Sequence, residues 1–515
     1  MNYLKIIPVF LFLSVYTISY SQLTSPQVDA LVREALEKFE VAGAAVAIVK
    51  DGRVIHQKGY GVQSIHTKVP VTEFTNFAIA SNTKAFTGAA LAILVEEGKI
   101  SWKDKVKQHL PEFKMYNEYV TDNFNIKDLL THRSGLGLGA GDLMFFPDGA
   151  DFTIADVLTV FQHFEPVSDF RTQYDYDNVL YLVAGEIIAR VSGLGFDDFI
   201  AQRILRPLNM NHSAASLQNI NNENLLAMPH STEGGDIRQI PHIVKSINGA
   251  AGGMFSNVAD MSTWIMLQLN KGRYAEGKTL FTEENHREMW RVHTVIDPNP
   301  YPRYNSHFAG YGLGWFLADK KGFLEVSHTG GLPGMLSKVV LLPGLNLGVV
   351  VLTNTENGGG SLFSTVTNTI LDSYMGLDDN GWLELNYKNL QNRKSQGDDI
   401  TRKVWEVVTK NRTPVDPKKY IGTYRDNWFG DVEVSLRNGE LWMAFERSPK
   451  LNGPLKLYKD HTFAIKWEYQ DMNADALATF ATDQSGKAQR ITLKGISPNI
   501  DFSFDFQDLD LKRVK

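Results

Sequence analysis

The segment Ser81-Asn82-Thr83-Lys84 places a serine and a lysine at a spacing suited to nucleophilic catalysis. An apolar, strand-like run at residues 77–80 gives way here to a helical pattern at residues 85–97, so both side chains fall on one helical face. A serine needs a base to attack a carbonyl, and a lysine buried near a helix N-terminus can have its pKa lowered enough to serve. Alone the motif is weak. About one chance match is expected in a chain this long, so Ser81 as an N-cap with a solvated Lys84 stays an alternative.

A second candidate cluster is Tyr176-Asp177-Asn178, directly before an apolar helical pattern that begins at Val179. A tyrosine between cationic groups can act as a general base or relay, and an asparagine two residues on can bind a substrate amide and the lysine. The spacing selects Tyr176 over Tyr174, which has no asparagine two positions on. The alternative is an aromatic turn residue followed by an N-cap asparagine.

The third cluster, His328-Thr329-Gly330-Gly331, ends a strand-like run. A strand edge there would present backbone N–H groups to an oxyanion, and the glycines would let a substrate approach closely. An ordinary strand-to-turn transition is the alternative.

The pattern around these clusters predicts an α+β fold. Residues 43–50 and 53–61 alternate like strands and are joined by Asp51-Gly52, which favours a hairpin. Helical patterns dominate up to about residue 270, and strand patterns return from about residue 310. We therefore expect one antiparallel sheet built from both ends of this region, with flanking helices and an inserted helical domain. Further strands are expected at 312–318, 323–328, 337–342 and 348–354, before a helix at 361–374.

The sequence pattern changes after residue 378. Residues 379–413 are predicted to be a linker, polar and helical in places. Residues 414–515 contain short strand patterns separated by turns, which predicts a small all-β barrel; its last candidate strand is 501–505. The first domain is expected at residues 22–378.

Composition excludes several classes of protein. The chain of 515 residues has no cysteine, which excludes disulfides, thiolate metal sites and cysteine nucleophiles. Its length requires two domains or more. A net charge of -6 without a basic stripe argues against nucleic-acid binding. No histidines have metal-ligand spacing, so neither a metal nor a cofactor is expected.

The first residues have the pattern of a signal peptide. A positive charge at Lys5 precedes an apolar run at residues 6–18, and Ser19 and Ser21 are the small residues that a signal peptidase reads. We expect cleavage between Ser21 and Gln22. No later segment is long and apolar enough to span a bilayer. The mature protein is therefore expected in a bacterial periplasm or exterior.

In their order along the chain, the three clusters resemble the motifs of the serine penicillin-recognising enzymes of the class C β-lactamase type. This group includes DD-carboxypeptidases, D-aminopeptidases and esterases. The resemblance runs over residues 25–374, and further matches lie at 129–136, 207–210 and 251–256. The C-terminal part resembles the lipocalin-like barrel that some relatives carry. We expect a structural cap as its role, because no motif there carries chemistry; a loop that narrows the cleft, or an oligomer contact, is the alternative.

The resemblance implies a role for each candidate residue. Ser81 would be the acylated nucleophile, and Lys84 and Tyr176 would share the general-base work. Asn178 would orient the substrate amide. The backbone N–H groups of Ser81 and Gly331 would form the oxyanion hole, and the other residues of the third cluster, His328, Thr329 and Gly330, would line the site.

One departure from the family pattern affects the expected substrate. Lactam-hydrolysing members usually carry a lysine where this chain has His328, and a histidine is mostly neutral at pH 7. We therefore expect an exported serine hydrolase that acts on a peptide, amide or ester, a class open to D-amino acids. The alternatives are a β-lactamase or DD-carboxypeptidase, and a penicillin-binding sensor that acylates without turnover. Oligomeric state is left open.

Overall fold

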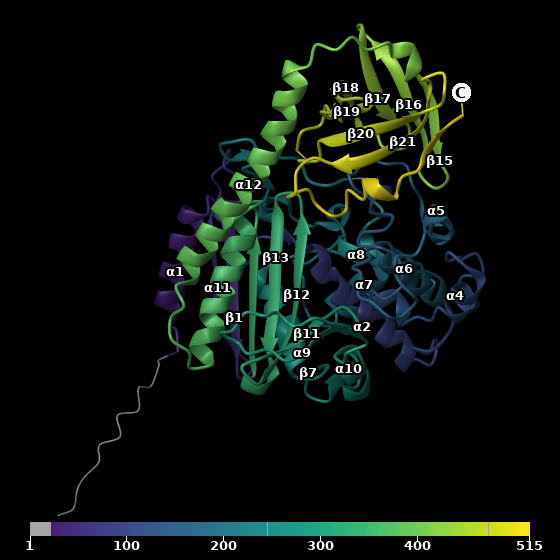
Figure 1. Ribbon diagram of the computed structural model, residues 1–515. Helices are drawn as coiled ribbons and strands as arrows, with labels where there is room; N and C mark the ends of the chain where they lie inside the picture. The colour runs from purple at the N-terminus through teal and green to yellow at the C-terminus, as the bar shows by residue number, and fades with distance from the viewer. Residues whose placement is uncertain (1–21, 245, 472, 515) are drawn as a thin grey trace, which may run out of the picture.

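The computed structural model describes residues 22–244, 246–471 and 473–514. The predicted signal peptide at residues 1–21 lies outside them. The described chain forms an eight-stranded antiparallel sheet flanked by helices, a long helix along one side, and a closed barrel over one end of the sheet (Figure 1).

The sheet joins the two ends of the first region, as predicted. Its strand order is β2-β1-β14-β13-β12-β11-β10-β9. The hairpin has the predicted bounds, and Asp51 and Gly52 both have positive φ (52° and 71°), which suits the twist of a two-residue turn. The strands are β1 (Gly43–Lys50), β2 (Arg53–Gly61), β9 (Thr294–Ile296), β10 (Ala309–Tyr311), β11 (Phe316–Lys320), β12 (Phe323–Leu332), β13 (Met335–Leu342) and β14 (Leu347–Thr353).

Both faces of the central strands are buried. Along β1, Ala44, Val46 and Ile48 pack in one hydrophobic core, while Ala45, Ala47 and Val49 pack in the other. The first core lies under α1 (Ser25–Lys38) and α11 (Gly358–Tyr374). The second lies under α2 (Thr83–Glu96) and α9 (Val258–Leu269).

Helix α2 is buried on almost every side, with residues 83–94 all buried. The ring of Phe86 stacks on that of Trp264 of α9, with centroids 3.8 Å apart. This packing fixes the helix that follows Ser81 at the centre of the catalytic region.

The helical insertion between β2 and β9 is also confirmed. Besides α2 and α9 it contains α3 (Val106–His109), α4 (Glu118–Asn123), α5 (Ile154–Val160), α6 (Val179–Ser192), α7 (Phe196–Ile200), α8 (Gly249–Gly252) and α10 (Glu283–Met289). Among the described residues no single helix is long and apolar enough to cross a bilayer; only the bent pair 179–192 and 196–205, taken together, passes by length and composition.

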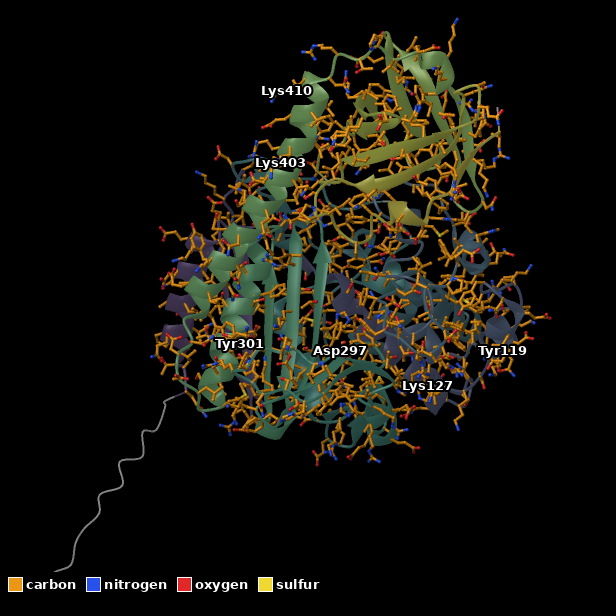
Figure 2. All side chains as sticks on the ribbon, viewed as in Figure 1. Tyr119, Lys127, Asp297, Tyr301, Lys403 and Lys410 are labelled. Atoms are coloured by element: carbon orange, nitrogen blue, oxygen red, sulfur yellow. The ribbon has the colours of Figure 1, made fainter. Side chains whose placement is uncertain are left out.

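The predicted linker is mostly one helix, α12 (Trp382–Lys410), of 29 residues. It packs along α11 and reaches the barrel, where Lys403 and Lys410 mark its far end (Figure 2). At 1.5 Å per residue the helix spans about 43 Å.

The C-terminal region is a closed eight-stranded antiparallel barrel, which confirms the predicted barrel. Closure leaves no unpaired sheet edge. Its strands are β15 (Gly422–Asp426), β16 (Gly430–Arg437), β17 (Glu440–Phe445), β18 (Asn452–Lys459), β19 (Thr462–Ile465), β20 (Ala476–Thr482), β21 (Ala488–Gly495) and β22 (Leu511–Arg513).

The predicted strand at 501–505 is wrong. Residues 501–505 form a turn, in which the carboxylate of Asp501 accepts a hydrogen bond of 2.8 Å from the N–H of Ser503. Strand β22 instead closes the barrel against β15 and β21. The alternation that resembled a strand arises because Ser503 and Asp505 point into the hydrolase domain.

Candidate active site

Ser81 lies in a sharp turn between β3 (Phe77–Ala78) and α2. The turn is a short 3-10 helix, and Ala80, just before the serine, has the left-handed φ of 47°. The side chain of Ser337 on β13 donates to the carbonyl of Ile79 (2.7 Å) and accepts from Asn82 (2.8 Å). These bonds hold the serine turn against the sheet, with Ser81 at the wall of a cavity.

Lys84 lies one helical turn later and is fully buried. Its Nζ is 3.2 Å from Ser81 Oγ, 2.6 Å from Asn178 Oδ1 and 2.9 Å from the Ala251 carbonyl oxygen. Burial lowers the pKa of Lys84 to about 7.

The partners of Lys84 define the form in which it can act as a base. Two of them, Asn178 Oδ1 and the Ala251 carbonyl, can only accept hydrogen bonds. A neutral amine has two hydrogens to satisfy them and one lone pair left. That lone pair faces Ser81, so a neutral Lys84 can accept the serine proton.

Tyr176 lies beside the same serine. Both side chains line the cavity, and Lys84 Nζ lies 4.8 Å from the ring centroid of Tyr176. His132 stacks on the ring with centroids 4.2 Å apart. Burial raises the pKa of Tyr176, so the free protein holds it as a neutral phenol at pH 7.

Asn178 joins the lysine to a buried acid. While its oxygen accepts from Lys84, its Nδ2 donates to Asp142 Oδ2 at 2.8 Å. Asp142 was not identified from the sequence. It follows a glycine-rich loop, and the composition of that loop is the one local feature of the sequence that could have indicated a functional residue here.

His328 is held as a neutral ring. Its Nδ1 is 2.6 Å from the Thr329 carbonyl, which only accepts, so Nδ1 carries the proton and Nε2 accepts from the Tyr311 hydroxyl at 2.8 Å. Burial lowers the pKa of His328 to about 3. The ring therefore brings no positive charge to the site.

The neighbours of His328 divide into two groups. Thr329 and Gly331 line the cavity, as does His328 itself. Gly330 does not: it packs against the serine turn, where a Cβ would lie 2.1 Å from the Ile79 carbonyl oxygen. Gly330 therefore permits close approach of the serine turn to β12, whereas Gly331 faces the space where a substrate would lie.

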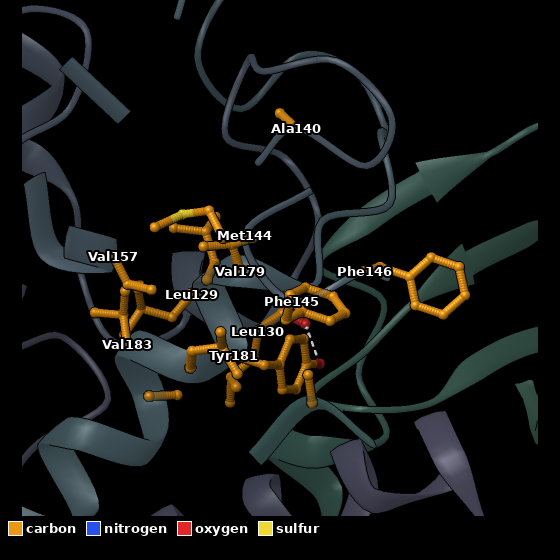
Figure 3. Packing of buried hydrophobic residues seen from close by; sticks show 14 of the residues in the cluster. Leu129, Leu130, Ala140, Met144, Phe145, Phe146, Val157, Val179, Tyr181 and Val183 are labelled. Carbon is orange, nitrogen blue, oxygen red and sulfur yellow. Dashed lines mark hydrogen bonds between the residues drawn. The ribbon is translucent and has the colours of Figure 1, made fainter. Parts of the chain in front are cut away.

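The cavity measures about 340 Å³ and is largely aromatic. From the loop before α5, Phe145 and Phe146 line it, while Met144 points into the helical core (Figure 3). In the adjoining core, the Tyr181 hydroxyl donates a hydrogen bond of 2.7 Å to the Leu130 carbonyl, which is the dashed line in Figure 3. The remaining wall comprises Ala80, Tyr174, Asn178, Asn248, Ala251, Gly252, Phe316, Leu332, Asp501, Phe502 and Ser503.

Three of these wall residues come from the barrel. Asp501, Phe502 and Ser503 lie in the loop before β22, and the ring of Phe502 meets that of Tyr176 edge-on at 5.8 Å. A loop of the C-terminal domain thus narrows the cleft. This is the alternative role that the sequence left open for the barrel, beside that of a structural cap. Among the described residues no group of three or more acidic or histidine side chains is arranged to hold a metal ion.

Comparisons with known proteins agree with this geometry. The Beta-lactamase family model matches residues 28–369, and the model of a domain of unknown function, DUF3471, matches residues 408–513. Protein flp of Staphylococcus aureus (strain MW2) is 30% identical over 341 residues, which are 64% of this chain and 63% of that protein. The chain thus spans less than two thirds of the length of this curated relative.

Two further proteins match over more of the chain. Unguisins hydrolase ungD' of Aspergillus campestris (strain IBT 28561) is 26% identical over 416 residues, 78% of this chain and 74% of that protein. The octameric penicillin-binding protein homologue from Pyrococcus abyssi has a TM-score of 0.61 at 21% identity, covering 93% of this chain and 99% of that one. The second likeness shows the fold alone. Because the family model spans more than half of the chain, this chain belongs to the beta-lactamase family.

Proposed function

We propose that the protein is an exported serine hydrolase that cleaves a peptide, amide or ester through an acyl-enzyme, a class that includes substrates with D-amino acids. The observation that carries the proposal is the placement of Lys84 Nζ 3.2 Å from Ser81 Oγ, in a buried site that lowers the lysine pKa to about 7. A base whose pKa lies near neutrality is suited to proton transfer at that pH.

In the proposed reaction, Ser81 Oγ attacks the substrate carbonyl carbon and its proton passes to Lys84. The N–H groups of Ser81 and Gly331 are assigned to the oxyanion. As the bond to the leaving group breaks, that group takes a proton from Tyr176, which recovers one from Lys84. Water then attacks the acyl carbon and gives one proton to Lys84. The bond between that carbon and Ser81 Oγ breaks, Oγ takes the proton back from Lys84, and the acid is released.

The assignment of Lys84 as the base and Tyr176 as the proton donor follows from their opposite pKa shifts. Burial favours the neutral form of each side chain, which makes a lysine a better base and keeps a tyrosine protonated. Asn178 is assigned to the substrate amide and to Lys84, and Thr329 to the opposite wall of the cleft.

The neutral His328 favours substrates without a carboxylate beside the scissile bond. A family member that hydrolyses lactams would pair that carboxylate with a lysine here. The name of the Aspergillus relative, a hydrolase, supports turnover rather than a binding role.

The first prediction concerns the nucleophile. A fluorophosphonate probe should add once to the wild-type protein, because Lys84 activates Ser81, and should not add to Ser81→Ala. Intact mass measures both. Ser485→Ala, a serine in an exposed turn of the barrel, is a control that should label normally. Absence of an adduct on folded wild-type protein would sink the proposal.

The second prediction is a pH dependence. Lys84 must be neutral to accept a proton, so the labelling rate should be low below pH 6, rise about tenfold per unit, and level above pH 8. Stopped-time labelling from pH 5 to 9 measures this. Lys338→Met removes another lysine whose pKa burial lowers, to about 8, and should leave the curve in place. A curve unchanged in Lys84→Arg, which cannot lose its proton, would contradict the assignment.

The third prediction separates the proposed function from its alternatives. Nitrophenyl acetate should be hydrolysed over many turnovers, and nitrocefin should not be turned over, because His328 offers no charge to its carboxylate. Absorbance assays measure both. Catalytic nitrocefin hydrolysis would favour the β-lactamase, and a single stoichiometric burst with the ester would favour the non-turnover sensor.

Export is proposed from the charged and apolar pattern of residues 1–21. Protein expressed with this segment in a bacterial host should be recovered from the periplasm or medium with Gln22 as its first residue. Intact mass measures the processing, and a mass that retains residues 1–21 in the cytoplasm would contradict it.

A further inference from the structure

The turn at residues 501–505 carries two polar side chains out of the barrel and into the hydrolase domain. In Figure 1 this segment belongs to the yellow stretch between the barrel and the upper ends of β12 and β13. Asp505 accepts hydrogen bonds from the N–H groups of Gly141 (2.8 Å) and Leu143 (3.1 Å). These bonds clamp the loop on both sides of Asp142.

Ser503 continues this contact toward the reacting atoms. Its hydroxyl donates to Asp142 Oδ2 at 2.8 Å, and the same oxygen accepts from Asn178 Nδ2 at 2.8 Å. Asn178 in turn accepts from Lys84 at 2.6 Å. A continuous path of hydrogen bonds therefore runs from the barrel to the amine that faces Ser81.

We propose that Ser503 of the C-terminal barrel is a positioning residue for the lysine base: it holds Asp142, and through Asp142 it fixes Asn178 against Lys84. The inference rests on the proposed function of Ser81 and Lys84, and it makes the barrel part of the active site rather than a cap beside it.

Docking of the barrel does not require this buried path. Arg447 pairs with Asp151 and Asp156 at 2.7 and 3.1 Å, and Lys450 pairs with Asp148 at 2.6 Å, all nearer the periphery. Asp142 is instead fully buried, and its Oδ1 has no hydrogen-bond partner among the residues that the structure describes. A buried carboxyl with an unsatisfied oxygen is costly for stability, which is typical of a group retained for function.

The charge of Asp142 also acts on Lys84. Burial raises the pKa of the Asp142 carboxyl, and any negative charge that it holds raises the lysine pKa. The other titratable groups that face this pair are Asp177, Asp505, Tyr176, Tyr181, His132 and His328. The variants below leave these groups unsubstituted, so a shift in the pH dependence of the labelling rate reports the charge of the Asp142 carboxyl.

The experiment measures fluorophosphonate labelling of the full-length protein, separated into the maximal rate kinact and the half-saturating concentration KI. Ser503→Ala should lower kinact about tenfold and change KI little, because the hydroxyl that it removes from the cavity wall is already donated to Asp142. Ser503→Thr keeps the hydroxyl and should retain the wild-type rate. Ser485→Ala, in an exposed turn of the barrel, is the control for a serine change in this domain.

Two variants of Asp142 test the path itself. Asp142→Ala should lower kinact at least as much as Ser503→Ala, and adding Ser503→Ala to it should cause no further loss, since both changes break one path. Asp142→Asn can keep both hydrogen bonds through its oxygen, with its NH₂ at the unpartnered Oδ1 position. Its rate at pH 9 should approach that of the wild type. Its acid limb should lie at the wild-type pH or lower, because the change can only remove a negative neighbour of Lys84.

The outcomes separate this inference from the proposed function. Wild-type protein that does not label refutes the function of Ser81 itself. Wild-type protein that labels, with Ser503→Ala equally fast, overturns the positioning role alone. A Ser503→Ala effect confined to KI also overturns it, because Ser503 would then act on the probe. Losses of kinact that add fully in the double variant with Asp142→Ala overturn it too, because Ser503 would then act through another route.

Discussion

The burial of one amine governs the arrangement of this site. Lys84 lies in the interior, where its Nζ is 2.6 Å from Asn178 Oδ1 and 2.9 Å from the Ala251 carbonyl oxygen. Removing an ammonium from water is costly, so the interior favours the neutral amine. The same low-polarity environment keeps Tyr176 protonated and His328 neutral. One physical condition thus sets the protonation of three side chains.

The sheet and helices make that burial possible. Helix α2 packs against α6, α8 and α9, and the chain reaches it through a turn in which Ala80 adopts a left-handed backbone. Gly330 allows β12 to lie against this turn, at a distance that no other residue type would permit. Ser81, the proposed nucleophile, is therefore placed by backbone packing, and Lys84, the proposed base, by the helix that follows.

Local patterns predicted much of this structure. The hairpin has its predicted bounds because Asp51-Gly52 is a strong turn signal, and Ser81, Lys84, Tyr176 and Asn178 meet as their motifs indicated. The turn at 501–505 and Asp142 could not be found in this way. Alternating polarity in the turn reflects contacts with another domain, and Asp142 finds its partners 36 and 361 residues away. Such distant pairings leave no local pattern.

The separation of 361 residues between Ser503 and Asp142 also bears on how the molecule matures. The contact cannot form until the last turn before β22 has been synthesised and the barrel has closed. Domains tend to fold in the order in which they emerge, and contacts distant in sequence form slowly. Folding in this order would place Ser81 and Lys84 before the wall that narrows their cleft. The cleft would then be complete only once the barrel has folded, which couples assembly of the proposed site to the integrity of the C-terminal domain.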